Sequence, residues 1–276
     1  MLDIIKSLIL GFIEGITEWL PISSTGHLKL AGNLLEFENV SAGFPEMFDY
    51  VIQLGAILAV VVIYWNKLWP FTSREKGIIK RKSMMIWSKV IVAMIPAAVV
   101  GILLDDWVEA LLGNGKTEAT VISVALIFYG ILFIIVENIN VKRKPAIISM
   151  KALSYKDALL IGLFQVLSII PGTSRSGSTI LGAMILGVSR TVAAEFSFFL
   201  AVPVIFGASL LKILKFGFNF SGTEFVILAI GMLSAFVVSI LAIKFLMGYI
   251  KKKNFKVFGY YRIVLGLAIL ALFWLV

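Results

Sequence analysis

The chain has 276 residues, of which 60% are hydrophobic and only 15% are charged, and its formal net charge is +9. Soluble domains of this size carry about a quarter charged residues, so the composition excludes an ordinary water-soluble protein and indicates an integral membrane protein. Because the chain has no cysteine, disulfides, thiolate metal sites and iron–sulfur clusters are excluded. The positive charge requires no nucleic-acid partner, since basic cytoplasmic loops explain it. No polar linker divides the chain, so we expect one polytopic domain over residues 1–276.

The apolar segments fall into two kinds. A helix needs about 20 largely apolar residues to cross the hydrocarbon core. Six segments are candidates for such spans: 48–65, 89–104, 121–136, 196–211, 225–243 and 257–276. Two further apolar regions, 4–35 and 158–187, each contain a proline followed by a run rich in hydroxyl groups and glycine. We predict that these two regions are broken helices rather than simple spans.

The charges of the loops predict the orientation. Lysine and arginine gather in three segments, 66–89, 142–156 and 251–256, whereas acidic residues dominate 33–47 and 105–118. Basic loops belong on the cytoplasmic side, so the acidic ones face outward. A count of crossings then leaves six spans and two re-entrant helical hairpins. Region 4–35 enters from the outside, and region 158–187 enters from the inside.

The two broken regions also repeat each other. GFIEGITEWLPISSTG begins at Gly11 and GLFQVLSIIPGTSRSG begins at Gly162, with the same spacing between the first and last glycine. Each is followed by three spans, and the two units start on opposite sides of the membrane. We therefore predict an all-α integral membrane protein made of inverted repeats over about 1–140 and 155–276. In such folds the broken elements meet near the midplane, where the site lies.

The first hairpin carries three ionisable side chains within a short stretch. Glu14 and Glu18 are four residues apart and share a helical face, and Ser24 and His27 are three apart and can share the next one. Ionisable groups inside a membrane cost ~2.5–3.5 kcal/mol each on insertion scales, so they are functional candidates by default. Ser23 or Ser24 is suited to cap the half-helix that begins after the proline.

The second hairpin carries an arginine among hydroxyl groups. Arg175 keeps its proton at any accessible pH, and its planar fork suits the oxygens of a phosphate. Thr173, Ser174 and Ser176 surround it where a half-helix begins, and helix N-termini attract phosphate. Two such termini, with Ser23 and Thr25 on the first hairpin, predict one anion site between the hairpins.

Plainer interpretations stand beside these. The Glu14–Glu18 pair would also serve as a purely structural partner of Arg175. A lone histidine is usually a satisfied polar group, although the spacing from Ser24 favours chemistry for His27. Hydroxyl groups such as those of Ser23, Thr25, Ser176 and Ser178 often serve only helix packing in membranes.

The motifs at Glu14–His27 and Pro171–Gly177 resemble the two signature motifs of the undecaprenyl-diphosphatase family, the bacitracin resistance proteins, and the resemblance covers nearly the whole chain. It implies hydrolysis of undecaprenyl pyrophosphate to undecaprenyl phosphate and inorganic phosphate, which recycles the lipid carrier for cell-wall synthesis and confers bacitracin resistance. It also implies a bacterial cell-membrane protein in contact with membrane lipids, a site open to the extracytoplasmic side, a homodimer and dependence on a divalent cation.

Together, the residues and the resemblance suggest a mechanism. Ser24 would be the nucleophile, His27 the proton acceptor and later donor, and Arg175 the group that stabilises the transferred phosphoryl group. Glu18, helped by Glu14, would orient His27 or hold Mg²⁺ or Ca²⁺, which prefer oxygen ligands. Direct attack by water, with His27 or Glu18 as the base, is an open alternative.

The rival class is a transporter or flippase for the same phosphorylated lipid. Inverted repeats with broken helices are typical of transporters, so the architecture alone does not decide. The set Glu18, Ser24 and His27 favours the enzyme, because transport requires an anion site but no nucleophile beside a base.

Overall fold

The computed structural model describes residues 2–32, 34–71, 79–112 and 115–275, and the elements in these ranges are helices. Six of them are long: α3 (Phe44–Ile63), α5 (Arg81–Leu112), α6 (Lys116–Val141), α9 (Arg190–Phe216), α10 (Gly222–Ile250) and α11 (Lys256–Leu275). The shorter ones are α1 (Leu2–Thr17), α2 (Ser24–Gly32), α4 (Trp65–Leu68), α7 (Tyr155–Val166), the 3₁₀ turn η1 (Leu167–Ile169) and α8 (Arg175–Ile185).

All six predicted spans are confirmed as helices long and apolar enough to cross a membrane, so the chain is a multi-pass membrane protein. Four of these helices, α5, α6, α9 and α10, extend beyond the predicted segment at both ends, whereas α3 begins earlier than predicted and ends at Ile63, before the predicted end at residue 65. The clearest case is α5, whose apolar part ends at Leu104 although the helix runs to Leu112. The short helix α4 was not predicted.

Both predicted breaks are present. In the first hairpin α1 ends at Thr17 and α2 begins at Ser24, with Pro21 between them. In the second, η1 ends at Ile169 and α8 begins at Arg175, with Pro171 between them. Proline has no N–H to donate and clashes with the preceding turn, which favours a break at these two places, although α5 and α9 continue through Pro96 and Pro203.

Each hairpin packs against a span from the other half of the chain. α1 lies against α10, and α7 lies against α5. Both contacts are made by glycine: a Cβ atom on Gly11 would lie 2.3 Å from the carbonyl oxygen of Gly231, and one on Gly162 would lie 2.1 Å from that of Ala93. In addition α3 pairs with α9, and α6 pairs with α11. This exchange of partners is what two interlocked inverted repeats would produce.

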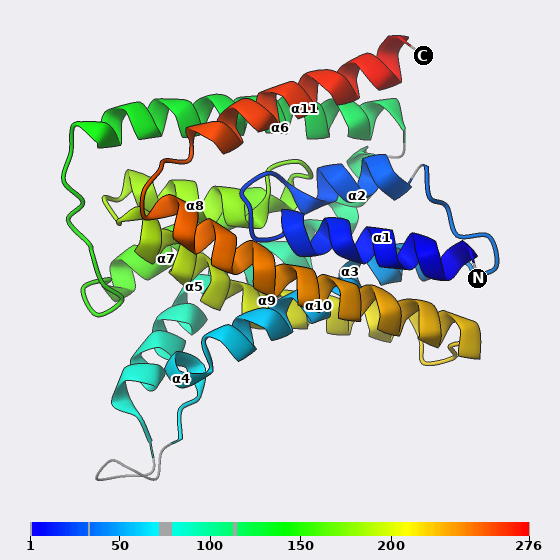
Figure 1. The fold of residues 1–276 in the computed structure, drawn as a ribbon, viewed down its shortest axis with the longest axis horizontal. Helices are drawn as coiled ribbons and strands as arrows, with labels where there is room; N and C mark the ends of the chain where they lie inside the picture. The colour runs from blue at the N-terminus through cyan, green and yellow to red at the C-terminus, as the bar shows by residue number, and fades with distance from the viewer. Residues whose placement is uncertain (1, 33, 72–78, 113–114, 276) are drawn as a thin grey trace.

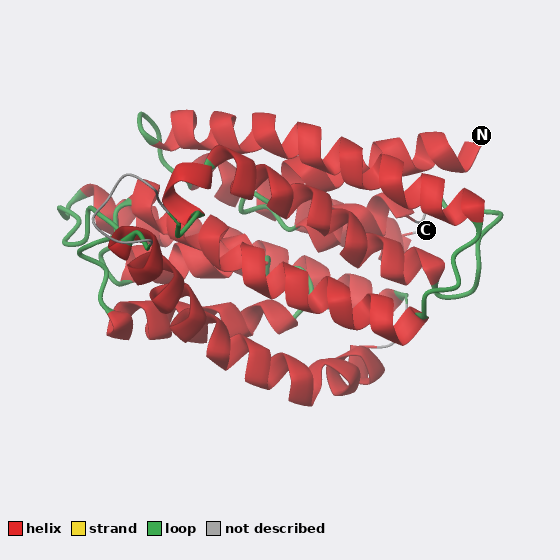
Figure 2. Ribbon diagram, turned by 90° about the horizontal axis from the view of Figure 1, so that it is seen from below, coloured by secondary structure: helices red, strands yellow, loops and turns green. Residues whose placement is uncertain are grey.

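The helices form layers along one long axis. In Figure 1, α6 and α11 lie side by side along one face, α2 and α8 lie next to them, and the remaining helices form the opposite part of the molecule. Figure 2 shows that most loops gather at the two ends of this axis, whereas a few short loop pieces lie in the interior.

The two ends separate the loops as their charges predicted. At one end Lys89 Nζ donates to the carbonyl oxygen of Met150 at 2.9 Å, and this hydrogen bond joins the basic segments 66–89 and 142–156. Residues 72–78 of the first of these segments lie outside the described ranges. At the other end Lys6 Nζ donates to Glu38 Oε1 at 2.8 Å. The connections α2–α3 and α9–α10 lie at that end too (Figure 1).

Each hairpin returns to the end from which it starts. Lys6 at the start of α1 contacts Glu36 and Glu38, which follow α2. The end of α8 lies beside the segment before α7, where the N–H of Ala146 donates to the carbonyl oxygen of Gly187 at 2.9 Å. This is the course that re-entrant hairpins require. Re-entry itself stays a prediction, because it depends on where the bilayer lies.

Candidate active site

The two interior turns, residues 18–23 between α1 and α2 and residues 170–174 between η1 and α8, share one unusual backbone conformation. Ser23 has φ 74° and Ser174 has φ 71°, a left-handed region in which residues other than glycine are uncommon. Each serine uses its hydroxyl oxygen to cap the helix that follows. Ser23 Oγ accepts from the N–H of Gly26 at 3.3 Å, and Ser174 Oγ accepts from the N–H of Gly177 at 3.1 Å. Of the two serines considered as the cap of α2, it is therefore Ser23 that fills this role.

The two hairpins meet in an ionic contact. One oxygen of Glu18, Oε1, accepts from Arg175 Nη2 at 2.9 Å and from Arg175 Nε at 3.2 Å. The other oxygen, Oε2, accepts from the hydroxyl of Ser24 at 2.8 Å. The side chains of Arg175 and Glu18 are only 10% and 7% exposed. A single buried carboxylate thus joins the candidate nucleophile to the candidate anion receptor.

Further hydrogen bonds fix this contact from outside the hairpin turns. Arg175 Nη1 donates to the carbonyl oxygen of Ser197 on α9 at 2.9 Å, and the hydroxyl groups of Thr179 and Ser197 lie 2.7 Å apart. Ser176 donates its hydroxyl hydrogen to the carbonyl oxygen of Glu18 at 2.9 Å. Ser176 therefore holds the hairpins together, which is the packing role weighed for it, and its hydroxyl is already committed.

His27 points elsewhere. Its Nδ1 lies 2.7 Å from the carbonyl oxygen of Ser23, and because a carbonyl only accepts, Nδ1 carries the hydrogen. The lone pair of Nε2 then accepts from the hydroxyl of Tyr261 at 2.7 Å, with the two rings stacked. Burial lowers the pKa of His27, which favours this neutral form. The hydroxyl of Ser24 donates to Glu18, so the expected Ser24–His27 pair is not formed here.

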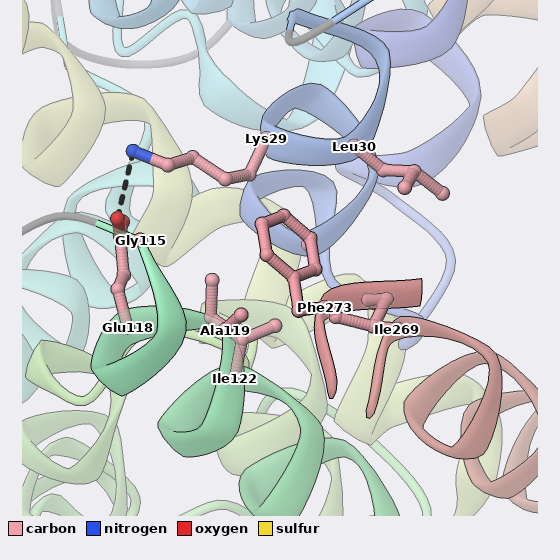
Figure 3. Close-up of a pocket in the computed structure, with 9 residues that line it drawn as sticks. Lys29, Leu30, Gly115, Glu118, Ala119, Ile122, Ile269 and Phe273 are labelled. Carbon is pink, nitrogen blue, oxygen red and sulfur yellow. Dashed lines mark ion pairs between the residues drawn. The ribbon is translucent and has the colours of Figure 1, made fainter. Parts of the chain in front are cut away.

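A cavity lies beside the first turn. It has a volume of about 280 Å³ and is lined by residues of α2, α6 and α11, including Gly26, Ile122 and Phe273. Lys29 reaches across it from α2 to Glu118 on α6, with 2.8 Å between Nζ and Oε2 (Figure 3). Gly26, two residues after Ser24, lies in the wall of the cavity, and Gly115 and Glu118 line it as well.

Comparison with known proteins now identifies the family. Residues 7–268 match the family described as bacitracin resistance protein BacA. The chain belongs to this family. A BacA-family relative from Acetivibrio thermocellus, named undecaprenyl-diphosphatase, is 58% identical over 99% of this chain and 98% of its own length. Proteins of the same name from Desulfitobacterium hafniense and Enterococcus faecalis are each 56% identical, over 99% and 98% of this chain and 97% and 96% of their own lengths.

The two residues expected to hold a divalent cation, Glu14 and Glu18, differ in their hydrogen bonds. Glu14 is fully buried and neither of its oxygens has a hydrogen-bond partner, whereas both oxygens of Glu18 are engaged. Within the described ranges no three His, Asp or Glu side chains come close enough together to hold a metal. Glu14 fits a hard cation because its lone pairs are unused. The other ligands would have to come from elsewhere, as is usual for Mg²⁺ bound with phosphate.

The other predicted substrate-binding residues differ in access. Thr25 is exposed, whereas the side chain of Thr173 is almost fully buried. The hydroxyl of Ser174 caps α8 and lies 3.2 Å from that of Ser176.

Two residues of α11 were missed. Tyr261 contacts His27, and the fully buried Arg262 contacts both turns. The signal for Arg262 was present in the sequence, because an arginine inside an apolar span is itself a functional candidate.

Proposed function

We propose that this protein hydrolyses undecaprenyl diphosphate to undecaprenyl phosphate and inorganic phosphate, and thereby recycles a cell-wall lipid carrier and confers bacitracin resistance. The relatives cited above bear the name of this activity and match the chain over nearly its whole length. One observation carries the proposal: the carboxylate of Glu18 is shared between the hydroxyl of Ser24 and the guanidinium of Arg175. Transport alone gives no reason to place a nucleophile on a base beside an anion receptor.

In the first step Ser24 Oγ attacks the terminal phosphorus of the diphosphate. Its proton passes to Glu18 Oε2, which already accepts the hydrogen bond. The bond from that phosphorus to the bridging oxygen breaks, and undecaprenyl phosphate leaves with the electron pair. A phosphoserine remains at Ser24. This assigns to Glu18 the role of proton acceptor that the sequence suggested for His27.

Arg175 links substrate binding to this step. Its fork presents two N–H groups to Glu18, and a diphosphate would compete for the same donors. When the fork turns to the phosphate oxygens, Glu18 loses its strongest partner and becomes a better base for Ser24. The guanidinium then stabilises the charge of the transferred phosphoryl group.

In the second step a water molecule attacks the phosphorus of the phosphoserine, the bond from phosphorus to Ser24 Oγ breaks, Oγ takes back the proton held by Glu18, and inorganic phosphate leaves. We assign His27 to this water through Tyr261: the hydroxyl of Tyr261 already donates to Nε2, so it would take a proton from the water while it passes its own proton to His27. Direct attack of water on the diphosphate, with Glu18 or His27 as the base, is the alternative route.

A divalent cation such as Mg²⁺ or Ca²⁺ would be held by Glu14, and Glu18 lies close by, four residues further along the chain. The cation would neutralise phosphate charge. The unpartnered oxygens of Glu14 support this assignment. Replacement of Glu14 by Gln should raise the Mg²⁺ concentration needed for half-maximal binding, measured by titration of the purified protein with Mg²⁺ alone.

The site would open to the extracytoplasmic side, since the cavity beside Gly26 lies toward the end of the molecule that carries the acidic segments 33–47 and 105–118. The undecaprenyl tail would remain among the membrane lipids. We also propose that two copies associate in the membrane. Each copy would hold a complete site, because Glu18, Ser24 and Arg175 belong to one chain.

The decisive experiment is phosphate release from undecaprenyl diphosphate by the purified protein in detergent, where transport has no meaning. We expect turnover by the unaltered chain and a phosphoserine after an acid quench during a single turnover. Turnover without any phosphoserine would favour direct attack by water. Binding of the lipid diphosphate without phosphate release would support the transporter interpretation and exclude the enzyme.

A further inference from the structure

Arg262 lies in an unusual place for an arginine. It is in the last span, α11, and it is fully buried. Burial of a guanidinium is costly unless hydrogen bonds replace its water, so the groups around it explain why it is tolerated. Among the described residues no Asp or Glu forms an ion pair with it. Its charge is therefore not there to balance a protein acid.

Its partners are backbone carbonyl groups of both interior turns. Nη1 donates to Pro21 in the first hairpin at 3.1 Å. Nη2 donates to Gly172 at 2.8 Å and to Thr173 at 2.9 Å in the second. Nε points to Leu126 on α6 at 3.4 Å. One rigid planar group thus contacts the two turns and one span at the same time.

The broken helices create the need for such a group. The carbonyls of Pro21, Gly172 and Thr173 lie in the turns, outside any helix, and a buried carbonyl without a donor is destabilising. The fork of arginine holds its donors at fixed angles, so it sets the spacing of the groups that accept from it. The fit behind the second turn is close, because a Cβ atom on Gly177 would lie 3.1 Å from Nη1.

The position of α11 allows this reach. α11 pairs with α6, and in Figure 1 the two helices lie along the face next to α2 and α8. From there Arg262 extends between the two hairpins, behind the turns that carry the reactive groups. Ser24 follows Pro21 by three residues in the chain, and Arg175 follows Thr173 by two residues.

We propose that Arg262 is a positioning residue whose guanidinium clasps the two turns at a fixed spacing, so that Ser24 and Arg175 meet on Glu18. The effect on turnover rests on the function proposed above, but the clasp itself does not. It acts through the backbone, and its N–H groups face carbonyls of the chain. Geometry rather than charge is the requirement, so lysine should not replace it.

The clasp can be measured directly. Because the chain has no cysteine, Thr25→Cys and Ile170→Cys introduce two unique sites for spin labels, one near each turn, and both positions are exposed. Double electron–electron resonance then gives the distribution of distances between the turns. We expect one narrow distribution when Arg262 is present. In Arg262→Met and Arg262→Lys the distribution should broaden to a similar degree.

The matched control is Arg190→Met. Arg190 also binds a buried group, since its Nε donates to the fully buried Glu137 at 2.8 Å, although its own side chain is 32% exposed, and none of its hydrogen bonds within the described ranges reaches either turn. Its loss should leave the distance distribution unchanged. If Arg190→Met broadens the distribution as much as Arg262→Met does, general loosening of the bundle is the cause and the clasp is refuted.

Kinetics on the unlabelled variants separate positioning from stability. Per folded molecule, kcat should fall at least about tenfold in Arg262→Met and Arg262→Lys, with KM changed by less than about threefold, because misplaced reacting groups slow chemistry more than binding. Arg190→Met should keep its kcat. A normal kcat in both Arg262 variants, or rescue by lysine, would overturn the proposal, as would a narrow distribution in both. If Arg262→Met does not fold, Arg262→Lys decides by the same criteria.

The two proposals fail in different ways. A broadened distribution in variants of a protein that releases no phosphate would leave the clasp standing and remove the enzyme. Full hydrolysis by the unaltered protein, with narrow distributions in the Arg262 variants, would do the reverse.

Discussion

The two hairpins have the same backbone and different side chains. With Gly11 aligned to Gly162, Ser23 falls on Ser174, and these two residues have nearly the same positive φ and the same cap on a glycine three residues later. Each hairpin packs by its first glycine on a span of the opposite half. The two hairpins therefore share one backbone arrangement around the site.

The two hairpins carry different polar side chains at the aligned positions. In the same alignment Ser24 of the first hairpin corresponds to Arg175 of the second, and Glu18 corresponds to Ile169. In the proposed mechanism the first hairpin supplies the nucleophile and the base, and the second supplies the anion receptor. Two copies of one turn would then divide a reaction between them, which a single turn could not do because both groups would need the same position.

The largest effect is expected at the second hairpin. Arg175→Ala should lower kcat by about 10³-fold, because the developing charge loses its main donor. Arg175→Lys should fall about 10²-fold, since a point charge does not reproduce the fork. Phosphate release in detergent measures both. An unimpaired Arg175→Ala would show that the second hairpin only supports the first.

On the first hairpin, Ser24→Ala and Glu18→Gln should each lower kcat by about 10²-fold to 10³-fold, with loss of the phosphoserine. Because the two groups act as a unit, the double variant should be no slower than the slower single one. Rates measured under saturating substrate test this. Multiplied effects in the double variant would mean that Glu18 is not the base of Ser24.

The shared frame is tested by equal changes in the two turns. Ser23→Ala and Ser174→Ala should each lose about 1 kcal/mol for the cap, while the strain of the positive φ stays the same because serine and alanine both carry a Cβ atom. The glycine variants should be milder, because glycine accepts this conformation. Thermal unfolding in detergent compares the four. A marked difference between the two turns would show that their similarity is not structural.

The smallest effect concerns His27. Tyr261→Phe removes the hydroxyl that donates to Nε2 and should lower kcat several-fold with KM unchanged, by slowing the hydrolysis of the phosphoserine. The control is Tyr260→Phe, at the exposed neighbouring position on α11. Accumulation of phosphoserine in the Tyr261 variant alone would support the assignment, and identical behaviour of the two variants would contradict it.

The sequence predicted the architecture well because hydrophobic length, loop charge and proline are strong local signals. The six spans, both breaks and the meeting of Glu18, Ser24 and Arg175 follow from them. The positive φ of Ser23 has no sequence signature, since serine usually avoids it. The partner of His27 could not be found either, because Tyr261 lies 234 positions away in the chain. Arg262 was overlooked for a different reason: the segment 257–276 is apolar enough to pass as a plain span.

The exchange of packing partners also orders events during biosynthesis. The hydroxyl of Ser7 in α1 bonds to the carbonyl oxygen of Ile227 in α10, 220 residues later. Until the ribosome has delivered that helix, the first hairpin packs on α3 but lacks the helix against which most of α1 lies. Insertion of the early segments must therefore precede their final packing, and removal of the second half would leave the first without its lining.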